Sequence, residues 1–173
     1  MDLVVLIYVF SFSPNVNNGK VGNSYSQIFI QCVFVVKYRA ARLQKPWRAE
    51  LFGVIGNLIN ESGAQTLIVN GVEDHVHCLF RLKPSQTVSE VMKVAKAKSS
   101  KWINESGFLE NRFEWQVGYG AFSYNQAEIK RVYRYIENQE EHHYGITFPD
   151  EYLDMLVKNG IEFQEEYLFH APV

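Results

Sequence analysis

Residues 70–80 read NGVEDHVHCLF, a tight-turn signal that runs into an apolar strand carrying two histidines. Asn-Gly favours a hairpin turn, and the residues from His75 to Leu82 predict the returning strand. Because side chains alternate along a strand, His75 and His77 share one face, close enough together to bind one metal ion. A buried imidazole needs a polar partner. The pair therefore indicates either two hydrogen-bonded structural histidines or part of a metal site.

Strand and helix patterns alternate on both sides of this hairpin. Further strands are predicted over residues 25–38, over 66–69 and within 115–125. Helices are predicted over residues 45–62, 87–105 and 126–143, followed by a short one over 150–158. The order β-α-β-β-α-β predicts an α+β, ferredoxin-like fold, an antiparallel sheet with helices on one face and an additional C-terminal helix.

The length and composition are those of one globular domain. The chain has 173 residues, of which 47% are hydrophobic and 21% charged. Cys32 and Cys78 both lie inside apolar runs, which indicates buried thiols of a reducing compartment and not a disulfide framework. We therefore expect a cytoplasmic protein.

The first twelve residues, MDLVVLIYVFSF, form an apolar run before a turn-rich segment. This run is too short to span a bilayer, and it lacks the basic start and the clear cleavage site of a signal peptide. We expect no association with a membrane. Residues 1–22 are interpreted as an N-terminal extension outside the fold, and residues 23–173 as a single domain.

The net charge of −2 hides an uneven distribution. Residues 25–105 carry eleven Lys and Arg against six Asp and Glu, whereas residues 106–173 carry five against twelve. The first part could bind a polyanion, although a solvated surface explains the imbalance equally well. Four lysines of the helix over 87–105 lie off its apolar stripe: Lys93, Lys96, Lys98 and Lys101.

The sequence RVYRYIENQEEHH, residues 131–143, contains a second group of polar side chains. On a helix, Tyr135 and Gln139 lie one turn apart on a face away from the apolar stripe, with Arg131 and His142 nearby. Taken alone, Tyr135 reads as a half-exposed aromatic. A zinc hydrolase would continue the histidine pair with Asp and a third His, but CLFRL follows instead.

Together, these motifs resemble the single-tyrosine HUH transposases of small bacterial insertion sequences, the IS200-like transposase family, and the related REP-associated tyrosine transposases. The resemblance rests on YSQIFIQCVFVVKY, NGVEDHVHCLF, WQVGYGAFSYN and YRYIENQEEHH, and it covers roughly residues 24–169. The first 22 residues depart from the family, whose members typically begin near Ser24.

The resemblance implies a metal-dependent endonuclease and strand transferase for single-stranded DNA. His75, His77 and Gln139 would hold Mg²⁺ or Mn²⁺, and Tyr135, on the additional helix, would attack the scissile phosphorus to give a 5′-phosphotyrosine intermediate. A phenol, with a pKa of about 10, needs help to react near neutral pH. One ester is exchanged for another, so no nucleotide cofactor is expected. His142 and His143 could be extra ligands, or simply surface groups at a helix end.

The resemblance also implies the partners. The substrate would be single-stranded DNA with a hairpin near the ends of the mobile DNA element. Two chains would form a homodimer whose active sites are shared between them. The candidate phosphate contacts are Lys37, Arg39, Lys93, Lys96, Lys98 and Lys101. Two alternatives stay open: a domesticated or inactive protein that binds such hairpins without cutting, and an unrelated metal-dependent hydrolase.

Overall fold

The computed structural model describes residues 25–39, 42–164 and 168, so the interpretation of residues 1–22 lies outside the described part. The strands are β1 (Ile28–Val35), β2 (Gln65–Gly71), β3 (His75–Leu82) and β4 (Gly120–Tyr124). The helices are α1 (Lys45–Glu61), α2 (Val88–Glu105), α3 (Ile129–Glu137), α4 (Gln139–His142) and α5 (Phe148–Lys158), with a 3₁₀ turn η1 (Lys37–Arg39) after β1. None of the helices in the described part is long and apolar enough to cross a bilayer.

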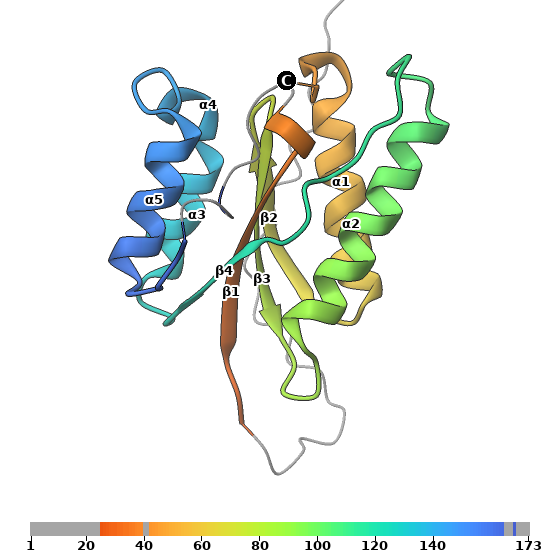
Figure 1. The fold of residues 1–173 in the computed structure, drawn as a ribbon. Helices are drawn as coiled ribbons and strands as arrows, with labels where there is room; N and C mark the ends of the chain where they lie inside the picture. Colours follow the sequence, from red (N-terminus) through yellow and green to blue (C-terminus); the bar gives the residue numbers. More distant parts are fainter. Residues whose placement is uncertain (1–24, 40–41, 165–167, 169–173) are drawn as a thin grey trace, which may run out of the picture.

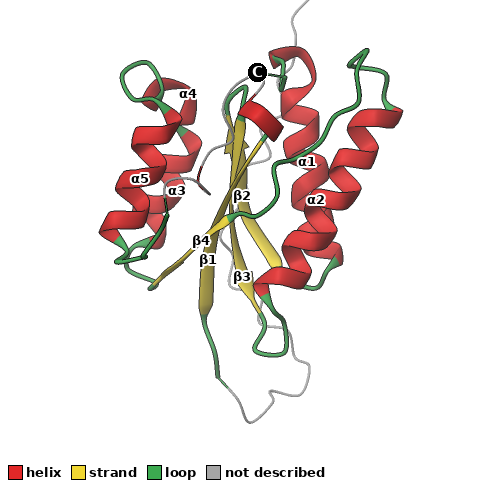
Figure 2. Cartoon of the chain, viewed as in Figure 1, coloured by secondary structure: helices red, strands yellow, loops and turns green. Residues whose placement is uncertain are grey.

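The four strands form one antiparallel sheet in the order β2-β3-β1-β4. This order, with α1 and α2 as the crossovers, confirms the predicted ferredoxin-like α+β fold. Helices α1 and α2 lie side by side on one face of the sheet, whereas α3, α4 and α5 lie on the other (Figure 1, Figure 2). The predicted additional helix is therefore a group of three, and it covers the face that α1 and α2 leave open.

Side chains along the two central strands, β1 and β3, point alternately to the two faces of the sheet and so divide the core between the two helix layers. Cys32 and Phe34 of β1, with Cys78 and Phe80 of β3, are buried against α1 and α2. The intervening residues face the C-terminal helices. On that face Leu79 packs with α3, but polar side chains take several of the other buried positions.

The turn between β2 and β3 differs from the prediction. Gly71 is the last residue of β2, and three residues, 72–74, make the connection where a two-residue Asn-Gly turn was predicted. A Cβ atom on Gly71 would lie 2.2 Å from the carbonyl oxygen of His75, so the close approach of the two strands requires glycine. Asn70 lies within β2 and not in the turn, so its side chain can make a contact elsewhere.

The predicted helix over 126–143 is interrupted at Asn138, which has φ −98° and ψ 26° and separates α3 from α4. The Asn70 side-chain amide donates hydrogen bonds to the carbonyl oxygens of Ile136 at 2.8 Å and Glu137 at 2.9 Å. These carbonyls end α3, where they lack partners within the helix. The β2-β3 hairpin thus fixes where α3 ends, and α4, which carries Gln139, starts directly after this break.

Candidate active site

His75 and His77 lie on the face of β3 that points to the C-terminal helices, as the alternation predicts. Both side chains are fully buried, and their ring centroids are 5.0 Å apart. His75 Nδ1 donates to Asp74 Oδ1 at 2.7 Å, which keeps the proton on Nδ1 and leaves the Nε2 lone pair facing the site. A carboxylate behind a histidine is the arrangement that orients imidazole ligands toward metals.

His77 is oriented by β1. The Gln31 amide nitrogen donates to His77 Nδ1 at 2.9 Å, and the Gln31 side chain is buried. A half-turn of this amide would place its oxygen on Nδ1 and leave Nε2 as the lone-pair atom. Burial lowers the pKa of His77 to about 4, so the ring is neutral at physiological pH, as a metal ligand must be.

Tyr135 and Gln139 reach the same place from α3 and α4. The Gln139 side-chain oxygen lies 3.2 Å from His75 Nε2, and its nitrogen donates to Glu151 Oε1 at 3.0 Å. The Tyr135 hydroxyl donates to the same carboxylate oxygen, and its ring stands edge-on to His77 with centroids 5.8 Å apart. Burial, and then the negative charge of Glu151, raise the pKa of Tyr135. The structure thus brings together all four residues that the sequence marks for catalysis and metal binding.

An ion pair helps to hold Gln139 in this position. Glu140, the next residue of α4, pairs with Arg48 and lies 3.0 Å from Lys45 Nζ, both from the first turn of α1. The Arg48 side chain is buried although it carries a charge, and its partner is half-exposed. A buried guanidinium needs such a partner. The ion pairs of Glu140 therefore hold α4 against the start of α1.

Glu151 of α5 is the centre of the cluster, and the sequence reasoning missed it. The side chain is buried, and its carboxylate oxygens lie near ring nitrogens of four histidines: His75 at 3.5 Å, His77 at 3.6 Å, His142 at 3.6 Å and His143 at 3.1 Å. Burial by itself would raise the pKa of Glu151, but hydrogen bonding and charge from the histidines outweigh burial and hold the pKa well below its usual range.

One signal in the sequence could have found Glu151. It lies on the same side of α5 as Phe148 and Met155, which are both buried. An acidic residue on the apolar stripe of an amphipathic helix must be paired or bound in the folded chain, because a buried charge without a partner is destabilising. The signal was hidden because the C-terminal segment is acidic as a whole.

His143 belongs to the site as well, and the surface-group alternative does not describe it. Its Nδ1 donates to the carbonyl oxygen of Ile146 at 2.8 Å, and its Nε2 lies 3.2 Å from His75 Nε2. His75, His143 and Glu151 can each offer one ligand atom, and these atoms lie within 4.8 Å of one another. This donor set of imidazole and carboxylate suits a divalent cation.

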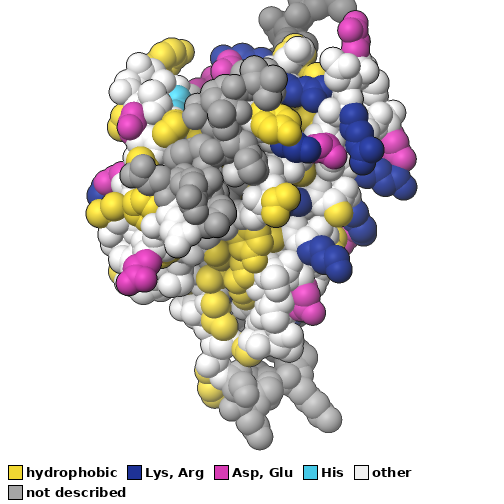
Figure 3. Space-filling model, viewed as in Figure 1, with side chains coloured by type: hydrophobic (Ala, Val, Ile, Leu, Met, Phe, Trp, Pro, Cys, Tyr) yellow, Lys and Arg dark blue, Asp and Glu magenta, His cyan; other side chains and the backbone are white. Residues whose placement is uncertain are grey.

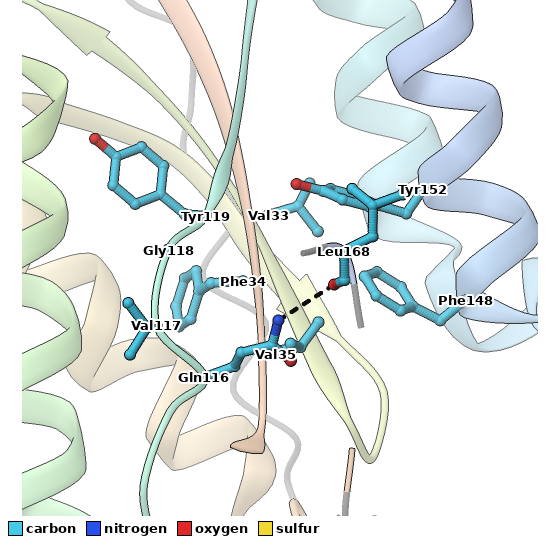
Figure 4. A pocket seen from close by; sticks show the side chains of 10 residues that line it. All are labelled: Val33, Phe34, Val35, Gln116, Val117, Gly118, Tyr119, Phe148, Tyr152 and Leu168. Atoms are coloured by element: carbon cyan, nitrogen blue, oxygen red, sulfur yellow. Dashed lines mark hydrogen bonds between the residues drawn. The ribbon is translucent and has the colours of Figure 1, made fainter. Parts of the chain in front are cut away.

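A cleft of about 660 Å³ gives access to the nucleophile candidate. It lies between α3, α5 and β1, and Tyr135, His142 and Glu151 are among its lining residues. Its other charged residues are of both signs: Glu128, Arg131, Asp150, Asp154 and Lys158. A smaller cavity of about 180 Å³ lies between β1, residues 116–119 and α5, and there the Gln116 amide donates to the Leu168 carbonyl at 3.2 Å (Figure 4). It is lined mainly by apolar side chains and contains none of the histidines.

Three of the six candidate phosphate contacts lie away from this cluster. Lys93, Lys98 and Lys101 are exposed on α2, in the layer on the opposite face of the sheet, and Lys and Arg side chains gather on that side of the molecule (Figure 3). Lys98 lies 3.5 Å from Glu61, and Lys101 lies 3.6 Å from Glu105, in pairs too exposed to hold the lysines firmly.

Two of the other candidates are bound within the chain. The Lys96 ammonium donates to the carbonyl oxygens of Gln116, at 2.6 Å, and Gly118, and burial lowers its pKa to about 8. Lys37 pairs with Glu114 at 2.6 Å. Arg39 ends η1, and its side chain lies outside the described part of the structure. Lys96 therefore holds the segment before β4 against α2.

Comparison with known proteins gives a family match. The family model for IS200-like transposases matches residues 24–139, a segment that contains His75, His77, Tyr135 and Gln139 and stops before α5. None of the curated proteins matches the chain.

Two solved structures share the fold. A candidate transposase from Deinococcus radiodurans R1 has 18% identity and a TM-score of 0.57, over 70% of this chain and 97% of its own. A REP-associated tyrosine transposase bound to a REP hairpin has 14% identity and a TM-score of 0.54, over 72% of this chain and 74% of its own. At these identities the two likenesses establish the fold alone.

Proposed function

The chain belongs to the IS200-like transposase family, and from that premise we propose that it cleaves and rejoins single-stranded DNA through a covalent bond to Tyr135. One observation carries the proposal: the Tyr135 hydroxyl reaches a buried cluster of histidine, glutamine and glutamate side chains, beside a cleft that opens to the outside. A titratable side chain that is surrounded by polar groups at the edge of a cleft is typical of an active site.

The chain's own residues account for the transesterification. The Tyr135 oxygen forms a bond to the scissile phosphorus, and the bond from phosphorus to the 3′-oxygen breaks. The Glu151 carboxylate, which already accepts the Tyr135 hydrogen bond, is placed to hold the phenol proton. The leaving 3′-oxygen ends as a hydroxyl. Because a phosphodiester is exchanged for a phosphotyrosine ester, a second 3′-hydroxyl can reverse the step and join the strands.

The site suits the divalent ion that the family implies, Mg²⁺ or Mn²⁺. His75 Nε2 and the Gln139 oxygen face each other at 3.2 Å, and His77 Nε2 is buried without a hydrogen bond. With the Gln31 amide turned so that its oxygen accepts from His77 Nδ1, these atoms are acceptors that fit a cation between them, and the mixture of nitrogen and oxygen favours Mn²⁺ over Mg²⁺. The ion would polarise the scissile phosphate.

The proposed substrate is a single strand that carries a hairpin. A related fold is known bound to a REP hairpin, and an unpaired strand can be drawn past a buried tyrosine more easily than a duplex. Lys93, Lys98 and Lys101 remain our candidates for backbone contacts, since their ammonium groups are exposed. Their distance from the cleft, across the sheet, fits a role in holding the hairpin and not the scissile phosphate.

The proposal is tested with a labelled oligonucleotide that contains a hairpin and a single-stranded flank. We expect Mn²⁺-dependent cleavage of the flank, and none when the flank is paired with a complementary strand. Binding without cleavage would favour the inactive hairpin-binding alternative. Hydrolysis of small phosphate esters that survives Tyr135→Phe would favour an unrelated hydrolase.

The family resemblance also implies a homodimer with shared sites, but in the described chain Tyr135 lies beside His77 of the same chain. A mixture of two inactive variants, Tyr135→Phe and His75→Ala, separates the two arrangements after subunit exchange. If each chain completes its own site, the mixture stays inactive. Recovery of cleavage would show that α3 of one chain serves the histidines of the other.

A further inference from the structure

We propose that Glu151, which α5 supplies from beyond the segment matched by the family, is a direct ligand of the divalent ion and also positions the nucleophile. The inference rests on the proposed function and adds a residue to it. Four observations support it: the facing nitrogens of two histidines, the burial of the carboxylate, the absence, among the described residues, of an ion-pair partner other than histidine, and the different partners of its two oxygens.

The nitrogens of His75 and His143 are the first observation. Each ring donates its Nδ1 proton to an oxygen, of Asp74 in one case and of Ile146 in the other. In the neutral rings both Nε2 atoms then carry lone pairs, and these atoms lie only 3.2 Å apart. Two lone pairs at this distance repel each other unless a metal ion or a proton lies between them. Glu151 Oε2 is 3.5 Å from one nitrogen and 3.1 Å from the other.

The burial of the charge is the second observation. The Glu151 side chain is 2% exposed, so its charge has lost almost all contact with water. Every ion pair that it forms in the described part of the chain is with a histidine. Because histidine is the only partner that could balance this buried charge, a divalent ion would supply the positive charge wherever the imidazoles are neutral.

The two oxygens of Glu151 have separate partners. Oε1 accepts hydrogen bonds from the Tyr135 hydroxyl and the Gln139 amide. Oε2 makes no hydrogen bond among the described residues, and it is the oxygen nearest to His75 and His143. Oε2 is therefore the ligand atom, while Oε1 holds the phenol beside the ion. A carboxylate oxygen also fits Mg²⁺ and Mn²⁺, which prefer hard ligands.

Titration calorimetry of the metal-free full chain with Mn²⁺ tests the inference. Glu151→Gln keeps the size of the side chain and removes its charge, so we expect Mn²⁺ affinity to fall at least about tenfold, the smallest loss typical of a change in a metal site. The control, Glu162→Gln, removes the same charge from an exposed position beyond α5 and should bind Mn²⁺ like the parent. Parent-like affinity in Glu151→Gln would overturn the inference and leave Glu151 as the partner of a protonated histidine.

A second measurement avoids the variant in case Glu151→Gln does not fold. In the parent chain labelled with ¹³C-glutamate, infrared difference spectra on adding one equivalent of Mn²⁺ should show a shifted carboxylate band. An unchanged band would overturn the inference. The failures are distinguishable: a parent that binds no Mn²⁺ refutes the metal site altogether, whereas a parent that binds Mn²⁺ and cleaves DNA, with unaltered binding in Glu151→Gln, refutes only the role of Glu151.

Discussion

Replacing Tyr135 by phenylalanine is expected to abolish the covalent adduct between protein and DNA while leaving the affinity for single-stranded DNA nearly unchanged. The substitution removes the attacking oxygen and keeps the ring that packs edge-on against His77. Loss of a nucleophile lowers rates by roughly four orders of magnitude or more. Denaturing gel electrophoresis with a labelled strand measures the adduct, and a binding titration measures the affinity.

Tyr144→Phe is the matched control for this substitution. The Tyr144 side chain is 88% exposed, so losing its hydroxyl should leave adduct formation intact. If Tyr135→Phe still formed the adduct at the parent rate, another tyrosine would be the nucleophile, and the assignment of Tyr135 would fail.

His75→Ala and His77→Ala are each expected to remove Mn²⁺-dependent cleavage, because each substitution deletes a ring that faces the cluster around Glu151. The domain should still fold, since neither ring belongs to the large apolar core between the sheet and helices α1 and α2. Thermal unfolding with and without Mn²⁺ measures both effects in one experiment. An ion that binds only the folded state raises the melting temperature. We expect this rise in the parent and its loss in each variant.

The outcome that would contradict this prediction is equally direct. A variant that unfolds at the parent temperature and keeps the Mn²⁺-dependent rise would show that its histidine is not a ligand of the ion. A variant that unfolds without Mn²⁺ well below the parent would show that the ring stabilises the domain in its own right, as the hydrogen bonds from His75 to Asp74 and from Gln31 to His77 allow.

The sequence predicts the parts of the fold that depend on short-range pattern. Residues 75–82 form β3 as predicted, because alternation and bounding turns are local properties of the chain. The second helix begins at Val88 with Thr87 as its cap and ends at Glu105, close to the predicted bounds. Strand alternation and the helical repeat are local as well, and they put the histidines, Tyr135 and Gln139 on faces that point to one another in the fold.

The features that the sequence did not predict depend on contacts between distant segments. The helix break at Asn138 follows contacts of Asn70 with the end of α3, which no helical pattern contains. Lys96 appears free on a helical wheel, but the folded chain brings the carbonyl oxygens of Gln116 and Gly118 to its ammonium group. Glu151 joins the histidines only once α5 packs on the sheet. Each of these contacts forms between segments that are distant in sequence or separated by a loop.

The most direct test of the central claim is the location of the covalent bond. The full chain is incubated with Mn²⁺ and a single-stranded hairpin oligonucleotide, both protein and DNA are digested, and peptides that carry a nucleotide are identified by mass spectrometry. We predict a nucleotide joined through its 5′-phosphate to Tyr135. A nucleotide on Tyr124, Tyr133 or Tyr144, or cleaved DNA with no modified tyrosine, would contradict the account.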